Sequence, residues 1–249
     1  MARVLVIQHG PSQTPGRLGM TLRDHGFSLD VRRPDLPADR APAGTHTHLP
    51  SDLDGIHAVI SLGGLQSTTD PHPWLDAERD LLKRAHDKGL AVVGICLGHQ
   101  LLAQALGGEV GEMDKPEAGF VDVKLTIPAQ TESMLGGIAW TAPQFQSHRA
   151  HVTKAPPGAT VLATSEACPV QAFKIGLRTY SFQYHFECDR AMIETFSREQ
   201  QALFTDAGVS PDVLSDQADN HYEMFARLAD RLCVNLASYA FPFSTLTAV

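Results

Sequence analysis

The feature that most constrains this chain is a cysteine between two glycines, Gly94-Ile95-Cys96-Leu97-Gly98, directly after the apolar run at residues 90–93. An apolar run of this length next to glycine is typical of a buried strand, and leucines and alanines with helical spacing follow at residues 101–106. A strand that ends in Gly-x-nucleophile-x-Gly and passes straight into a helix makes a tight turn. The segment therefore predicts a nucleophile elbow at Cys96.

Two interpretations of Cys96 compete. A free cysteine is often a small core residue. A helix N-terminus behind the thiol, however, favours a negative charge, and the thiolate is the reactive form. Because the two glycines, the strand before them and the helix after them all agree with an elbow, we favour the nucleophile.

A cysteine nucleophile needs a base, and the base needs an orienting group. The segment Tyr184-His185-Phe186-Glu187 offers both at the end of a predicted strand, residues 179–184. Side chains two residues apart project from one face of a strand, so His185 and Glu187 can pair while Phe186 points into packing. His185 would carry the proton from Cys96 to a leaving amine, and Glu187 would hold the imidazole. The alternative is a structural histidine at a strand end.

These motifs, in the order Cys, His, Glu, resemble the class I (triad-type) glutamine amidotransferases, in particular the glutaminase domain of GMP synthases. Three further segments resemble the same family: Gly63-Gly64 within residues 60–69, Ala118-Gly119-Phe120, and Gln146-Ser147-His148. The chain has Leu65 and Phe186 where the family usually has proline.

The resemblance implies that Cys96 attacks the side-chain amide of glutamine, releases ammonia and leaves a γ-glutamyl thioester for hydrolysis. It implies that no cofactor is needed and that the backbone N–H groups of Gly64 and Leu97 form the oxyanion hole. The substrate-binding residues it implies are Gly63, Gln100, Gly119, Phe120, Ser147 and His148.

The remaining pattern predicts an α/β fold with an open, mostly parallel, flavodoxin-like central sheet and flanking helices. Strands are expected at 4–7, 27–31, 58–61 and 90–93, with helices at 14–25 and 73–88 between them. Short alternating segments at 121–127, 145–152, 160–164, 170–175 and 179–184 predict a small antiparallel extension. Helices at 190–205 and 210–237 predict a helical tail on a catalytic core of residues 3–190, within a single domain, 1–249.

Composition excludes several classes of function. The net charge is −8 and no cluster of Lys and Arg occurs, so a nucleic-acid surface is not expected. No stretch reaches membrane-spanning length, and the N-terminal apolar run is too short for a signal peptide. The four cysteines lack metal-type spacing, so we expect no metal site and a cytoplasmic protein with reduced thiols.

Three functions remain open. The first is a free-standing glutaminase acting on L-glutamine, because the chain has no nucleotide-binding glycine loop of its own. It would either pass ammonia to a separate synthetase subunit or simply hydrolyse its substrate. The second is a γ-glutamyl peptide or amide hydrolase with the same triad, which would accept larger leaving amines. The third is a non-catalytic regulatory or binding protein on the same fold.

Overall fold

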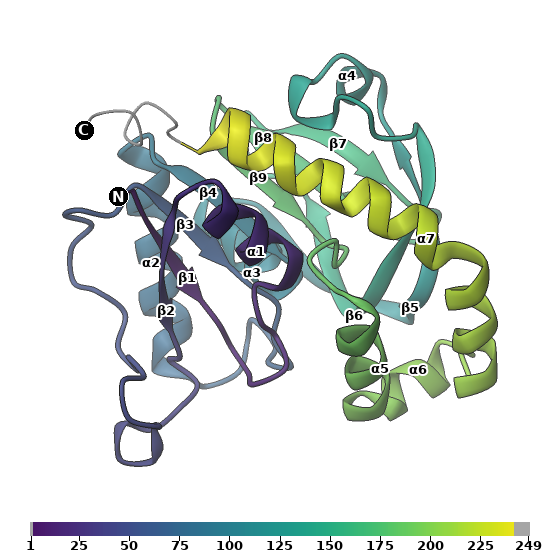
Figure 1. The fold of residues 1–249 in the computed structure, drawn as a ribbon, viewed down its shortest axis with the longest axis horizontal. Coiled ribbons are helices and arrows are strands. Elements are labelled where there is room, and N and C mark those ends of the chain that lie inside the picture. The colour runs from purple at the N-terminus through teal and green to yellow at the C-terminus, as the bar shows by residue number, and fades with distance from the viewer. Residues whose placement is uncertain (1, 242–249) are drawn as a thin grey trace.

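The computed structural model describes residues 2–241, which contain one nine-stranded sheet in the order β2-β1-β3-β4-β9-β8-β7-β5-β6 (Figure 1). The strands are β1 (Arg3–Ile7), β2 (Ser28–Arg32), β3 (Ala58–Ser61), β4 (Ala91–Ile95), β5 (Glu109–Leu125), β6 (Thr141–Lys154), β7 (Thr160–Thr164), β8 (Ala172–Ile175) and β9 (Thr179–Phe182). The α-helices are α1 (Gly16–Asp24), α2 (Pro73–Asp87), α3 (Leu97–Ala105), α4 (Ile127–Gln130), α5 (Arg190–Glu199), α6 (Gln201–Asp206) and α7 (Pro211–Asn235). Short helical turns cover Ala38–Arg40, Ser133–Leu135 and Leu236–Ala240.

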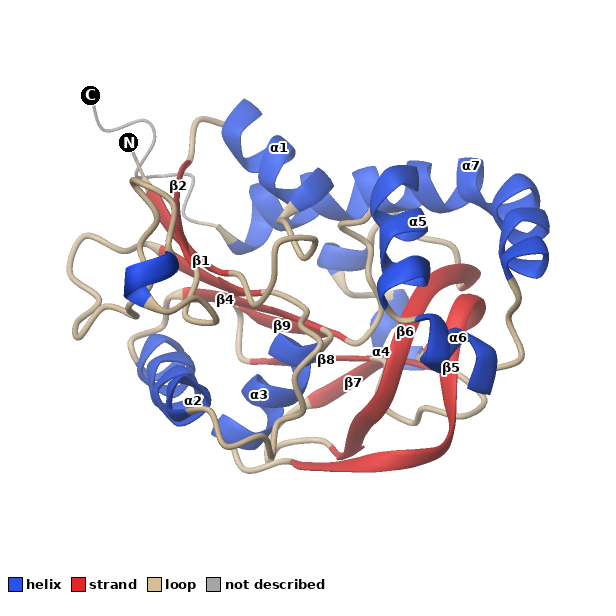
Figure 2. Ribbon diagram, turned by 90° about the horizontal axis from the view of Figure 1, so that it is seen from below, coloured by secondary structure: helices blue, strands red, loops and turns tan. Residues whose placement is uncertain are grey.

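The first half of the sheet is parallel, as the sequence predicts. Strands β2, β1, β3, β4 and β9 pair in parallel, and every residue of β3 and β4 is buried. Helices α1 and α7 cover one face of the sheet, and α2 and α3 cover the other (Figure 2). Covering both faces explains why the central strands β1, β3 and β4 are mostly apolar runs.

The second half is antiparallel and differs from the prediction at two places. Strand β5 begins at Glu109, well before residue 121, and forms a long ribbon with β6. Strand β9, expected inside the antiparallel extension, instead pairs in parallel with β4 and antiparallel with β8. The strand that leads to His185 therefore lies next to the strand that leads to Cys96.

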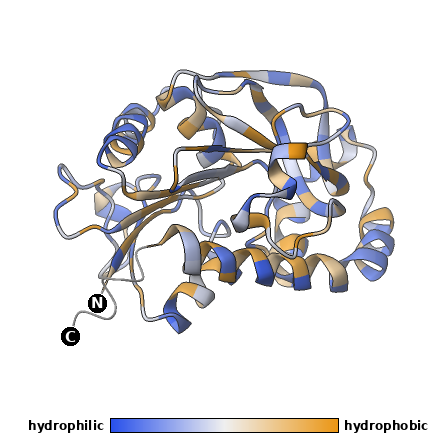
Figure 3. Cartoon of the chain, turned by 90° about the horizontal axis from the view of Figure 1, so that it is seen from above, coloured by the Kyte–Doolittle hydropathy of each residue, from blue (hydrophilic) through white to orange (hydrophobic). Residues whose placement is uncertain are grey.

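The C-terminal helices belong to the packed structure. The helix predicted at 190–205 is divided at Gln200 into α5 and α6. Apolar and polar residues alternate along α7 (Figure 3), and its Phe225 and Leu232 are buried against the sheet. Arg17 on α1 donates to Asp230 at 2.8 Å and to the Tyr222 hydroxyl at 2.7 Å, which ties α7 to α1.

Within residues 2–241, none of the helices combines the length and the apolar character that crossing a bilayer requires.

Candidate active site

The nucleophile elbow is present at Cys96. This cysteine has φ 51° and ψ −105°, and it is the one non-glycine residue with positive φ among residues 2–241. Such a conformation costs about 1–3 kcal/mol and is found mainly where the surrounding structure enforces it for function. A side chain on Gly94 would lie 2.6 Å from the Gly98 carbonyl oxygen, and one on Gly98 would lie 2.1 Å from the Ser61 carbonyl oxygen. Both flanking glycines are thus required by close backbone approach.

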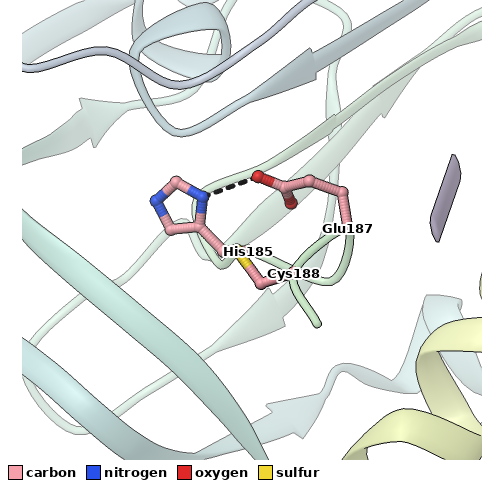
Figure 4. A group of neighbouring side chains, drawn as sticks. All are labelled: His185, Glu187 and Cys188. Atoms are coloured by element: carbon pink, nitrogen blue, oxygen red, sulfur yellow. Dashed lines mark hydrogen bonds and ion pairs between the residues drawn. The ribbon is translucent and has the colours of Figure 1, made fainter. Parts of the chain in front are cut away.

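His185 and Glu187 form the predicted pair. His185 Nδ1 donates to Glu187 Oε1 at 2.8 Å, and both side chains are 2% exposed (Figure 4). The pair lies in the turn after β9 rather than on one face of a strand, so the strand geometry expected from the sequence is wrong although the pairing is present. Phe186 is fully buried, as predicted, with its ring edge-on to Phe182.

His185 lies beside Cys96. A methyl group on Gly63 would lie 2.8 Å from His185 Cε1 and 3.5 Å from Cys96 Cβ, which places the three residues around one point. Burial alone would lower the pKa of His185, but the charges of Glu187 and Cys96 outweigh it and raise that pKa well above 6.5. The imidazole is therefore held ready to take and keep the proton of the thiol.

Cys96 opens into a cavity of about 170 Å³. The sequence-predicted residues that line this cavity are Gly64, Cys96, Leu97, Gln100, Ser147 and His148. The Leu97 N–H is the first of helix α3, and the first N–H groups of a helix have no partner within it. Gly64 also lines the cavity, and a side chain added to it would meet the Leu97 side chain at 2.6 Å and His9 at 2.9 Å. The two residues whose N–H groups are expected to form the oxyanion hole are thus neighbours.

Gly119 and Phe120 are placed elsewhere. They do not line the cavity, and the Phe120 N–H donates to Gln217 Oε1 on α7 at 2.9 Å. Gly119 has φ 75°, and a side chain there would lie 2.3 Å from that same oxygen. Their position therefore does not support the expectation that they bind the substrate. Both residues lie where β5 contacts the C-terminal helix α7.

The pocket wall opposite the elbow is held by a buried polar network. His148 Nε2 donates to Glu117 Oε2 at 3.0 Å, and the two residues are direct cross-strand partners on β6 and β5. Glu117 also accepts from Gln171 at 2.7 Å and from Ser165 at 2.5 Å. The buried Oγ of Ser147 has no hydrogen-bond partner among residues 2–241. That hydroxyl is free to bond a ligand.

One group of described residues has metal-type donors. His185, Glu187 and Cys188 offer three ligand atoms within 4.8 Å of one another (Figure 4). Burial and the charge of Glu187 raise the pKa of the Cys188 thiol to about 12, which keeps it protonated. His185 Nδ1 is bonded to Glu187, so this arrangement fits a proton-transfer pair better than a ligand set.

The sequence prediction missed a second buried cluster beside the elbow. It consists of His9, which follows β1, Ser61 at the end of β3, and Glu78 on the inner face of α2. The signal was present in the sequence, because Glu78 occupies an inward position between Leu75 and Leu81 on an apolar stripe. A carboxylate at such a position is buried only when it is paired.

Comparison with known proteins agrees with this geometry. The family model described as glutamine amidotransferase class-I matches residues 17–194. The glutamine amidotransferase-like protein YfeJ of Salmonella typhimurium is 32% identical over 212 residues, which cover 82% of this chain and 84% of YfeJ. The crystal structure of a glutamine amido transferase from Methylobacillus flagellatus is 27% identical, with a TM-score of 0.80 over 95% of this chain and 94% of that one.

The fold and site thus define a class I glutamine amidotransferase architecture, and the chain belongs to the class-I glutamine amidotransferase family. The glutamine-hydrolyzing GMP synthase subunit of Thermococcus kodakarensis is 35% identical over 108 residues, which cover 43% of this chain and 56% of that protein. The chain therefore spans about half the length of this relative.

Proposed function

We propose that this chain is a glutaminase that hydrolyses the side-chain amide of L-glutamine to glutamate and ammonia. The observation that carries the proposal is the Cys96 elbow, with His185 and Glu187 behind it and a small cavity in front. Cys96 attacks the amide carbonyl, and His185 gives its proton to the departing ammonia. Water then hydrolyses the γ-glutamyl thioester, with His185 acting as the base.

The oxyanion of each tetrahedral intermediate is bound by the N–H groups of Gly64 and Leu97. Removing one such donor costs about 10²–10³ in kcat in enzymes where this was measured. Glu187 orients His185 and stabilises its charge through their 2.8 Å hydrogen bond.

Two features of the cavity support an amino-acid substrate. Its volume of about 170 Å³ is below the roughly 300–1,000 Å³ of pockets for drug-sized ligands. Its lining includes Glu112 and Arg149, whose opposite charges complement an α-ammonium and an α-carboxylate, and Arg149 is also ion-paired with Asp206. The free Ser147 hydroxyl and the side chain of Gln100 supply further polar contacts.

The ammonia acceptor we propose is a separate synthetase chain. The relation to a protein named as one subunit of a GMP synthase supports this, because such a protein works with at least one other chain.

The proposal is tested by measuring ammonia and glutamate release from L-glutamine by the purified protein, with Cys96→Ala as the control. Turnover by the wild type alone is the expected result. Turnover of γ-glutamyl peptides with large leaving amines, and none of glutamine, would replace the glutaminase by a γ-glutamyl hydrolase. Equal rates in wild type and Cys96→Ala would refute both.

A further inference from the structure

A buried ion-pair cluster lies directly behind the Gly63-Gly64 loop. His9 Nε2 contacts Glu78 Oε2 at 2.8 Å, and the Ser61 hydroxyl donates to Glu78 Oε1 at 2.6 Å. The other ring nitrogen, His9 Nδ1, contacts the Gly63 carbonyl oxygen at 3.1 Å. His9 is 1% exposed, and Ser61 and Glu78 are fully buried. None of these side chains has a role in the chemistry derived above.

The partners of His9 determine where its protons lie. A carbonyl oxygen only accepts, so Nδ1 must carry a proton to bond Gly63. The carboxylate of Glu78 accepts at Nε2, so a doubly protonated ring satisfies both contacts. Burial opposes this charge, but Glu78 and the hydrogen bonds to Glu78 and Gly63 outweigh burial and raise the pKa of His9 above 6.5. The two contacts and the direction of the pKa both favour a doubly protonated ring, with the Nδ1–H pointing at the Gly63 carbonyl.

That carbonyl belongs to the same peptide unit as the Gly64 N–H. The peptide bond is trans, so its C=O and N–H point in opposite directions. With His9 fixed at the carbonyl end, the N–H end faces away from His9. The loop is tied to His9 a second time, because Gln66 Nε2 donates to the His9 carbonyl oxygen at 3.1 Å.

The ring of His9 is itself held in place. Its plane stacks on Trp74 of α2, with centroids 5.2 Å apart and an interplanar angle of 14°. Because the ring of His9 contacts Trp74, the Glu78 carboxylate and the Gly63 carbonyl, it has little rotational freedom. Such a residue is suited to fixing the orientation of a neighbouring peptide.

We propose that His9 is a positioning residue for the oxyanion hole: it orients the Gly63–Gly64 peptide through the Gly63 carbonyl and polarises it, so that the Gly64 N–H is a stronger and better aimed donor. The inference rests on the proposed function, in which Gly64 binds the oxyanion. Hydrogen bonding at one end of a peptide strengthens the donor at its other end. The alternative is that the pair with Glu78 only anchors α2 to the sheet.

Two substitutions separate these roles, because each keeps one of the two contacts. In His9→Asn, the side-chain amide nitrogen takes the place of Nδ1 and still donates to Gly63, but the contact with Glu78 is lost. In His9→Gln, the amide nitrogen takes the place of Nε2 and still donates to Glu78, but the contact with Gly63 is lost. Should the unpaired carboxylate unfold His9→Asn, the same two substitutions are compared in a Glu78→Gln background. His86→Asn is the matched control, because His86 lies on the same helix as Glu78 but bonds Thr179.

Two reactions of Cys96 are measured for each variant, with Cys96→Ala as the blank. In the first, the thiolate attacks p-nitrophenyl acetate, the ester C–O bond breaks, p-nitrophenolate leaves and an acetyl thioester forms through an oxyanion. In the second, iodoacetamide alkylates the thiolate and iodide leaves, with no oxyanion. We expect His9→Gln to lose about 10- to 100-fold in acylation, somewhat less than loss of a whole donor. Alkylation should stay within about twofold, and His9→Asn should acylate within about threefold of the wild type.

The reverse order, with His9→Gln the better enzyme, would overturn the proposal and assign His9 to anchoring α2. Equal losses in acylation and alkylation would also overturn it, since they indicate general loosening of the site. Acylation by the ester needs only Cys96 and the oxyanion hole. The comparison therefore remains decisive even if the wild type turns over no γ-glutamyl compound, a result that would refute the proposed function alone.

Discussion

Gly63 is the position where one added methyl group should disable the site without unfolding the protein. In Gly63→Ala, the new carbon would lie 2.8 Å from His185 Cε1, about 0.6 Å short of the 3.4 Å at which ordinary van der Waals contact begins. His185 cannot move by that amount and keep its 2.8 Å hydrogen bond to Glu187. A misplacement of about 1 Å can cost 10²-fold in rate, so we expect a loss of about 30- to 100-fold in kcat.

The assay is steady-state glutamate release, with iodoacetamide alkylation of Cys96 and the melting temperature measured in parallel. Alkylation should slow in Gly63→Ala, because the displaced imidazole no longer supports the thiolate, whereas the His9 variants should alkylate normally. Gly136→Ala is the control. Gly136 has φ −58°, and the nearest atom to its added methyl carbon would be the Ser133 carbonyl oxygen, at 3.2 Å. A Gly63→Ala enzyme within about threefold of wild type would show that His185 is not confined as argued.

Further substitutions test the triad, the C-terminal contact and the pH dependence. Glu187→Gln should lose less glutaminase activity than His185→Ala, because Glu187 orients the base and transfers no proton; the opposite order would exclude this assignment. Gly119→Ala should lower the free energy of unfolding in urea by about 1–3 kcal/mol, through its positive φ and the contact with Gln217, with kcat within about threefold of wild type; an unchanged midpoint would contradict this. Burial lowers the pKa of His99 from 6.5 to about 3, so the unfolded chain binds a proton that the folded chain excludes, and stability should fall by about 2 kcal/mol from pH 6.5 to pH 5. That part of the loss should be absent in His99→Gln. If the free energy of unfolding, measured by urea titration, fell equally between pH 6.5 and pH 5 in the wild type and in His99→Gln, the assignment to His99 would be refuted.

The sequence predicts best what local rules decide. Strand β3 has the predicted bounds, Ala58–Ser61, because a short apolar run between polar residues has few alternatives. The beginning of β5 at Glu109 was missed because residues 109–117 are rich in charge and do not alternate. Their strand conformation comes from pairing with β6, and the burial of Glu117 there is compensated by its cross-strand partner His148 together with Gln171 and Ser165. Such pairing depends on residues far along the chain.

In the candidate site, too, the features decided by neighbouring residues were predicted and those decided by distant residues were not. The elbow and the His185–Glu187 pair are recognisable from short motifs, since neighbours in the sequence determine them. Gly119 and Phe120 were expected at the substrate, but their surroundings are decided by Gln217 on a helix nearly a hundred residues away. His9 and Glu78 were not selected, because the inward position of Glu78 on α2 indicates a buried partner but does not identify it, and only the fold brings His9 to it.

The sheet topology explains how a base so far along the chain reaches the nucleophile. Strands β4 and β9 are parallel neighbours, with Gly94 opposite Ser181 and Ile95 opposite Phe182. Their carboxyl ends therefore meet at one edge of the sheet, and the Cys96 N–H donates to the Phe182 carbonyl oxygen at 2.9 Å. The antiparallel ribbon of β5 to β8 is the connection between these two strands, so its residues from Ser147 to Ala150 form the opposite wall of the cavity. Changes in the length of that ribbon should alter the pocket while the register of β4 with β9 keeps nucleophile and base together.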